Sequence, residues 1–126
     1  MRVPVKITIV ESPYTTTRAS PLECVRYACW ACFDCVMRGE APFASHLLYA
    51  QILPETKHSR QIGLAMRDTI AKATMGLVAQ YTDLGVTPGM VRDVDCTAVV
   101  EQRTLAGLAL AAWKRGEWPA GSIRVL

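Results

Sequence analysis

The chain lacks the sequence signatures of several common classes of ligand-binding and membrane protein. It contains neither a GxxxxGK[ST] loop nor a GxGxxG motif, so ordinary P-loop and dinucleotide chemistry are disfavoured. No apolar run approaches the roughly 18 residues that a membrane span needs. The net charge of +3 is spread along the chain and forms no basic stripe, which argues against a dedicated nucleic-acid-binding domain. A small anionic ligand stays compatible, because it needs only one or two well-placed arginines.

The beginning of the chain is typical of a strand and not of a signal peptide. Apolar and polar residues alternate in MRVPVKITIVESP, and no small-residue cleavage site follows. Five cysteines, an odd number, do not suggest a disulfide framework. We therefore expect a reduced, cytoplasmic setting. A chain of 126 residues can bury a core of its own, and we expect residues 1–126 to form a single domain.

Four of the cysteines lie in the stretch ECVRYACWACFDCV, with the spacing C-x4-C-x2-C-x2-C. Such spacing holds zinc or iron–sulfur clusters when a loop wraps the thiols around one point. Here Ser20, Pro21 and Glu23 match a helix-capping box, and no glycine or proline interrupts residues 22–38 before Gly39. A helix would instead distribute the four thiols along its length and would not bring them to one point. The pattern favours a helix with cysteines in the core over a metal site, and we expect no metal and no cofactor.

Apolar residues recur at helical spacing along this stretch and predict the face that meets the core. Small, polarizable thiols suit close packing of a helix against a sheet. The predicted stripe consists of Leu22, Val25, Cys29, Cys32, Phe33, Val36 and Met37.

Strand and helix patterns alternate along the chain. We expect strands at residues 5–10, 41–45, 75–81 and 123–126, and helices at 21–38, 60–74 and from 90 to about 115. In the second helix the inward residues should be Ile62, Met66, Ile70 and Ala73. Such alternation implies parallel strands joined by right-handed crossovers. The predicted fold class is therefore α/β, a single-domain, doubly wound, Rossmann-like or flavodoxin-like sheet of about four mostly parallel strands flanked by helices.

A doubly wound sheet binds its ligand at the carboxyl ends of its strands, near the switch in strand order. Polar and aromatic residues concentrate at these positions, and residues 87–90 begin a predicted helix whose free N–H groups suit a phosphate. Structural roles without a ligand stay open for these residues, since His46 could bond to the backbone, Asp83 could be a turn residue and Tyr14 could pack at an edge. The expected ligand-binding residues are Glu11, Ser12, Pro13, Tyr14, Arg18, Ser45, His46, Arg60, Tyr81, Asp83, Thr87, Gly89 and Met90.

The turn Ser12-Pro13-Tyr14 after the first strand resembles that of the nucleoside 2-deoxyribosyltransferase-like superfamily. The segments RGEAPFASHLLY and YTDLGVTPGM more closely resemble an uncharacterised family of that fold found in phages and bacteria, and the resemblance extends over about residues 5–95. It implies a ligand that is a small nucleotide or a nucleoside-derived compound. It also implies a homo-oligomer, because superfamily relatives complete their pockets with neighbouring subunits.

The superfamily's enzymes cleave or transfer N-glycosidic bonds with a glutamate nucleophile four residues after the turn glycine, a position at which this chain has the shorter Asp93. They also carry an aspartate at the start of the third strand, where this chain has Thr74-Met75-Gly76. The leading hypothesis is therefore a nucleotide-binding protein that holds a ribosyl-phosphate-type ligand, in the manner of a phage anti-defence protein that captures a nucleotide signal. The alternatives are an N-glycosidase or transferase that uses Asp93, and a structural oligomer with a vestigial pocket. We expect neither a nucleic-acid polymer nor a membrane as partner.

Overall fold

The computed structural model describes residues 6–74, 76–88, 90, 99–105 and 107–122. In this part of the chain one sheet of four parallel strands has the order β2-β1-β3-β4. The strands are β1 (Ile7–Glu11), β2 (Ala41–Phe43), β3 (Leu77–Tyr81) and β4 (Val100–Arg103). The predicted α/β fold class is confirmed, because this order and the parallel pairing are those of flavodoxin-like folds.

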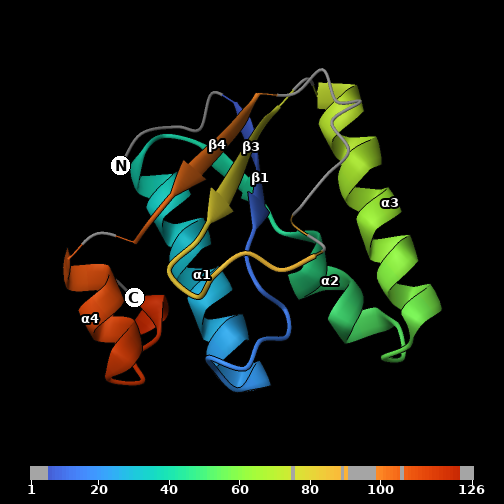
Figure 1. Ribbon diagram of the computed structural model, residues 1–126. Helices are drawn as coiled ribbons and strands as arrows, with labels where there is room; N and C mark the ends of the chain where they lie inside the picture. Colours follow the sequence, from blue (N-terminus) through green and yellow to red (C-terminus); the bar gives the residue numbers. More distant parts are fainter. Residues whose placement is uncertain (1–5, 75, 89, 91–98, 106, 123–126) are drawn as a thin grey trace.

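Helices cover both faces of the sheet (Figure 1). On one face α1 (Pro21–Met37) packs against α4 (Gly107–Lys114) and the short α5 (Pro119–Ser122), around a core that includes Tyr27, Trp30 and Trp113. On the other face α3 (Lys57–Thr74) packs Ala71 against β1 and β3, and α2 (Ser45–Ile52) lies against α3. None of the described helices has the combined length and apolarity of a membrane span.

The start of α1 confirms the predicted capping box. The Ser20 hydroxyl accepts a hydrogen bond from the Glu23 N–H at 3.2 Å, and the Glu23 carboxylate accepts one from the Ser20 N–H at 2.8 Å. The cysteine stretch is therefore helical, with Cys24 and Cys35 buried and the two cysteines between them half-buried. Among the residues that the structure describes, no three metal-binding side chains come together.

The face of α1 that meets the core differs from the predicted one. In the predicted stripe, Leu22 is 62% exposed and Met37 is 61% exposed. α1 is apolar around most of its circumference, and the opposite face carries the large rings of Tyr27 and Trp30, which bury more area. The buried positions of this helix are Cys24, Arg26, Tyr27, Ala28, Trp30, Ala31 and Cys35.

The long helix predicted from residue 90 to about 115 is wrong. Val100–Arg103 form β4, which pairs in parallel with β3 and places Gln102 beside Gln80. β4 is the last strand in the order of the described sheet, and three of its four residues are exposed. Its sequence VEQR therefore shows neither the apolar run of a buried strand nor strong strand propensity. Residues 91–98 and the predicted strand at 123–126 lie outside the described part of the chain.

Two element boundaries also differ from the prediction. The second strand ends at Phe43, and Ser45 is the first residue of α2 and not the end of the strand. α3 begins at Lys57, before the predicted Arg60, and its capping hydroxyl belongs to Thr56, which accepts from the Ser59 N–H at 3.0 Å. The buried residues of α3 are Ser59, Gly63, Arg67 and Ala71, in place of the predicted inward apolar row.

Candidate functional site

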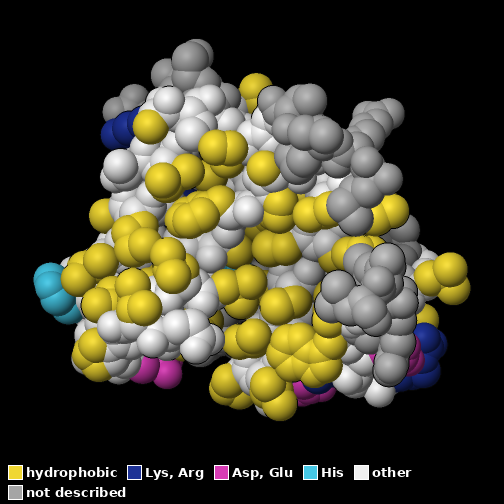
Figure 2. All heavy atoms as spheres, turned by 180° about the vertical axis from the view of Figure 1, so that it is seen from behind, with side chains coloured by type: hydrophobic (Ala, Val, Ile, Leu, Met, Phe, Trp, Pro, Cys, Tyr) yellow, Lys and Arg dark blue, Asp and Glu magenta, His cyan; other side chains and the backbone are white. Residues whose placement is uncertain are grey.

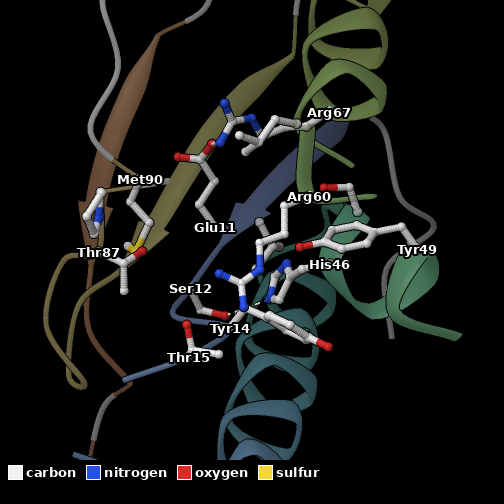
Figure 3. Close-up of a pocket in the computed structure, with 14 residues that line it drawn as sticks. Glu11, Ser12, Tyr14, Thr15, His46, Tyr49, Arg60, Arg67, Thr87 and Met90 are labelled. Carbon is white, nitrogen blue, oxygen red and sulfur yellow. Dashed lines mark hydrogen bonds and ion pairs between the residues drawn. The ribbon is translucent and has the colours of Figure 1, made fainter. Parts of the chain in front are cut away.

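A cavity of about 360 Å³ opens at the carboxyl end of β1 (Figure 3). It is lined by the end of β1 with its following loop, by residues 45–49 of α2, by α3 and by the connection after β3. β1 is the strand at which the order reverses, with β2 on one side and β3 on the other. The cavity therefore lies where doubly wound α/β folds generally place a ligand.

A buried ion pair forms the inner wall of the cavity. Glu11 on β1 is 3% exposed, and its Oε2 lies 2.7 Å from Nη1 of Arg67 on α3. The Gln80 side-chain amide donates to Glu11 Oε1 at 2.9 Å and to the Met90 carbonyl at 2.6 Å. These bonds join β1, β3 and α3, and they compensate both buried charges. The inner wall is consequently fixed in place before any ligand arrives.

Ser12 and His46 form the second group in the cavity. Ser12 follows β1, His46 lies in the first turn of α2, and the Ser12 Oγ is 3.0 Å from the His46 Nε2. Desolvation by burial, with a smaller effect of the Arg67 guanidinium, lowers the pKa of His46 to about 4. The imidazole is therefore neutral at pH 7 and offers one N–H donor and one acceptor nitrogen. This pair suits a polar, uncharged part of a ligand such as a sugar hydroxyl.

Two tyrosines supply an aromatic wall. The ring centroids of Tyr14 and Tyr49 are 5.9 Å apart, and the ring planes are tilted by 48°. Tyr49 lies so close to α3 that a Cβ at Gly63 would be 2.2 Å from its Cδ1. Glycine is required at this position because any side chain would displace the ring. Flat aromatic rings of this kind are surfaces on which nucleobases stack.

Arg60 is the exposed cation at the cavity. It lies two turns before Arg67, so both residues share one face of α3, and Figure 3 shows both side chains leaving that helix toward the cavity. Its Nη2 is 3.0 Å from the Glu55 Oε1, and the two side chains are 47% and 58% exposed. An exposed pair of this kind contributes about 0–1 kcal/mol. An anionic ligand can therefore replace Glu55 as the partner of Arg60 at little cost.

Comparison with protein families finds a match over most of the chain. Residues 6–104 match DUF7768, which is described as a domain of unknown function. The chain belongs to the DUF7768 family. The match covers the whole described sheet and every described residue that lines the cavity, whereas α4 and α5 lie beyond it. No curated protein and no solved structure matches the chain significantly.

The fold of this DUF7768 domain brings together most of the residues that the sequence suggested. Two of them, Gly89 and Asp93, lie outside the described residues. Those that line the cavity are Glu11, Ser12, Tyr14, Ser45, His46, Arg60, Thr87 and Met90.

Pro13 and Arg18 do not line the cavity. Pro13 belongs to the loop that follows β1, and its side chain is fully buried. The Arg18 guanidinium lies over Gly85, where its Nη1 would be 3.3 Å from a Cβ added to that glycine. Gly85 lies in the turn after β3 and has a positive φ of 91°, so Arg18, which packs on it, covers this turn and does not line the ligand cavity.

Tyr81 and Asp83 are also placed away from the cavity. Alternate residues of a strand face opposite sides, so Tyr81 faces α1 where Gln80 faces α3. The Tyr81 hydroxyl donates to Asp34 Oδ2 at 2.5 Å. Asp83 Oδ2 accepts from the Tyr27 hydroxyl at 2.6 Å and from the Leu105 N–H at 2.7 Å, so its carboxylate fastens the end of β3 to α1 and to the chain after β4.

Several lining residues were missed by the sequence analysis. Arg67 is the most important, and its spacing of two helical turns from Arg60 was an available signal. Tyr49 follows His46 by three residues, which places both on one face of α2. The full set of missed lining residues is Val10, Thr15, Tyr49, Leu64, Arg67 and Pro88.

Proposed function

We propose that this DUF7768 domain binds a small nucleotide, or a nucleoside-derived compound with a ribosyl phosphate, and holds it without cleaving it. The observation that carries the proposal is the cavity of about 360 Å³ at the switch in strand order, in which aromatic, neutral polar and cationic side chains converge. Its size lies within the range of about 300–1,000 Å³ that is usual for small-molecule pockets.

Each chemical part of a nucleotide has a matching wall in this cavity. The rings of Tyr14 and Tyr49 suit a base. The Ser12–His46 pair suits the ribose hydroxyls, because both groups are neutral and can donate and accept hydrogen bonds. Arg60 suits a phosphate, to which a guanidinium binds through two parallel hydrogen bonds.

The contacts of Glu11 argue against this residue as a catalytic carboxylate, whereas Asp93 lies outside the described residues. Hydrolysis of a glycosidic bond uses a carboxylate as acid, base or nucleophile. Glu11 is the one carboxylate among the described residues that line the cavity, and its two oxygens are engaged by Arg67 and Gln80. A carboxylate held in this way stabilises the fold and is poorly placed to attack an anomeric carbon.

Calorimetric titration with AMP, GMP, CMP, UMP and ADP-ribose tests the proposal. We expect at least one of them to bind, and Arg60→Gln to weaken that binding about ten- to a hundredfold, since a charged hydrogen bond is worth about 1.5–3 kcal/mol. Arg115→Gln is the matched control, because Arg115 is also exposed and paired with a carboxylate, that of Glu117. Absence of binding at millimolar concentration would contradict the proposal. Free base in chromatograms of the same mixtures would show cleavage instead.

We further propose that the domain is a homo-oligomer that associates through the outer face of α1. The row Leu22, Cys29, Val36 is partly exposed and carries no charge, and hydrophobic side chains cover much of the face shown in Figure 2. Exposed apolar patches of this kind mark protein interfaces. Light scattering at micromolar concentration should give a multiple of 13.8 kDa, and Leu22→Glu should reduce it. A monomeric mass for the unaltered protein would contradict association.

A further inference from the structure

The N-terminus of α2 opens into the cavity without a cap. Its N-cap residue is Ala44, and no side chain caps it, whereas Ser20 caps α1 and Thr56 caps α3. The Leu47 N–H bonds to the Ala44 carbonyl at 3.1 Å. The N–H groups of the two preceding residues come before the first intrahelical bond and have no partner within the helix.

Ser45 provides a second and independent indication of a ligand. It lines the cavity and is only 5% exposed, yet its hydroxyl makes no hydrogen bond with any residue that the structure describes. Ser59, which is 4% exposed, differs because its Oγ accepts from the Thr56 hydroxyl at 3.0 Å. Among the described residues, the fully buried side-chain polar atoms without a partner are Thr8 Oγ1 and Arg26 Nε, so the Ser45 hydroxyl keeps contact with the cavity. It is therefore available to donate to an acceptor atom of a ligand there.

The charges around this helix end favour an anionic acceptor. Arg60 and Arg67 both line the cavity, and Glu11, which pairs with Arg67, is the one lining carboxylate among the described residues. The charges of the described lining residues therefore sum to a net positive charge. The N-terminus of a helix adds a partial positive charge and free N–H donors.

We propose that the N-terminus of α2 is the phosphate subsite of the nucleotide pocket proposed above. The N–H groups of Ser45 and His46 and the Ser45 hydroxyl donate to a phosphate group, and Arg60 pairs with its outer oxygens. The phosphate thus lies at α2 and not at residues 87–90, where the sequence had suggested it. At that second position the Met90 N–H already bonds to the Thr87 carbonyl at 2.9 Å.

The test compares each nucleoside 5′-monophosphate (AMP, GMP, CMP and UMP) with its nucleoside by calorimetric titration. Ser45→Ala should weaken binding of the monophosphate about three- to tenfold, the effect of one lost hydrogen bond, and leave the nucleoside unchanged. Ala44→Ser should weaken the monophosphate as well, because an N-cap hydroxyl competes for the His46 N–H. Ser59→Ala is the control, and it should lower stability without changing the ratio of the two affinities.

The outcomes separate this inference from the proposed function. Monophosphates and nucleosides that all fail to bind the unaltered protein would overturn the proposed function together with the subsite. A monophosphate that binds, but whose affinity neither Ser45→Ala nor Ala44→Ser changes, would overturn the subsite and leave the nucleotide pocket standing. Equal weakening of monophosphate and nucleoside would likewise place the phosphate elsewhere.

Discussion

Replacing Gly63 by alanine adds one methyl group between α3 and the ring of Tyr49. The new Cβ would lie 2.2 Å from Cδ1 and 2.3 Å from Cε1 of that ring, whereas carbon atoms in contact are normally about 3.5–4.0 Å apart. Overpacking of this kind typically costs about 1–3 kcal/mol, and alanine offsets about 1 kcal/mol through its higher helix propensity. We expect Gly63→Ala to lower the free energy of unfolding by about 1–2 kcal/mol.

Urea unfolding of four proteins isolates the steric term. These are the unaltered chain, Gly63→Ala, Tyr49→Ala and the double variant. In the Tyr49→Ala background the clash is gone, so Gly63→Ala should stabilise the helix by about 1 kcal/mol. The substitution thus changes sign between the two backgrounds. The same effect in both backgrounds, or a stabilising effect in the unaltered chain, would refute the packing of Tyr49 on Gly63 and with it the aromatic wall.

Three further predictions concern other parts of the molecule. His46 has a pKa of about 4 in place of its ordinary 6.5, so at pH 5 the unfolded chain binds a proton at this residue that the folded chain does not. His46 should therefore make the protein about 2 kcal/mol less stable at pH 5 than at pH 7. Urea unfolding at both pH values should show this loss of stability in the control variant His58→Gln but not in His46→Gln. Arg103→Ala leaves the buried Glu40 carboxylate without its bidentate partner at 2.8 Å and should lower the free energy of unfolding by about 3–5 kcal/mol. A decrease below about 1 kcal/mol in urea unfolding would contradict this. Asp83→Ala should lower the free energy of unfolding by about 3 kcal/mol, because it removes two hydrogen bonds. The affinity for AMP should stay within a few-fold of the unaltered value, and a large loss of that affinity would show that Asp83 reaches the ligand.

The sequence predicted those elements whose ends or apolar character depend on a few neighbouring residues. The capping box at Ser20 fixed the start of α1, and the nearly unbroken apolarity of β3 marked it as a buried strand. The rule that ligands lie at carboxyl ends of strands then led to Ser12, His46 and Arg60, which the fold does bring together.

The rest depends on contacts between residues far apart in the chain. β4 is polar and exposed because it lies at the edge of the described sheet, and no local pattern distinguishes it from a helix. Arg67 is buried where Glu11 of β1 pairs with it, a contact between residues 56 positions apart that the apolar pattern of α3 does not indicate. The position of Asp83 depends likewise on Tyr27, a partner 56 positions away.

A nuclear magnetic resonance titration tests the central claim most directly, because it reports where a ligand binds. AMP, GMP, CMP, UMP and ADP-ribose would each be added to ¹⁵N-labelled protein while the backbone amide signals and the tryptophan indole signals are followed. We expect the largest shifts at Ser12, Tyr14 and Ser45, with no shift of the indole signals of Trp30 and Trp113, which donate to backbone carbonyls on the opposite side of the sheet. No shifts with any of these compounds at millimolar concentration, or shifts confined to the tryptophan side, would contradict a nucleotide pocket at the end of β1.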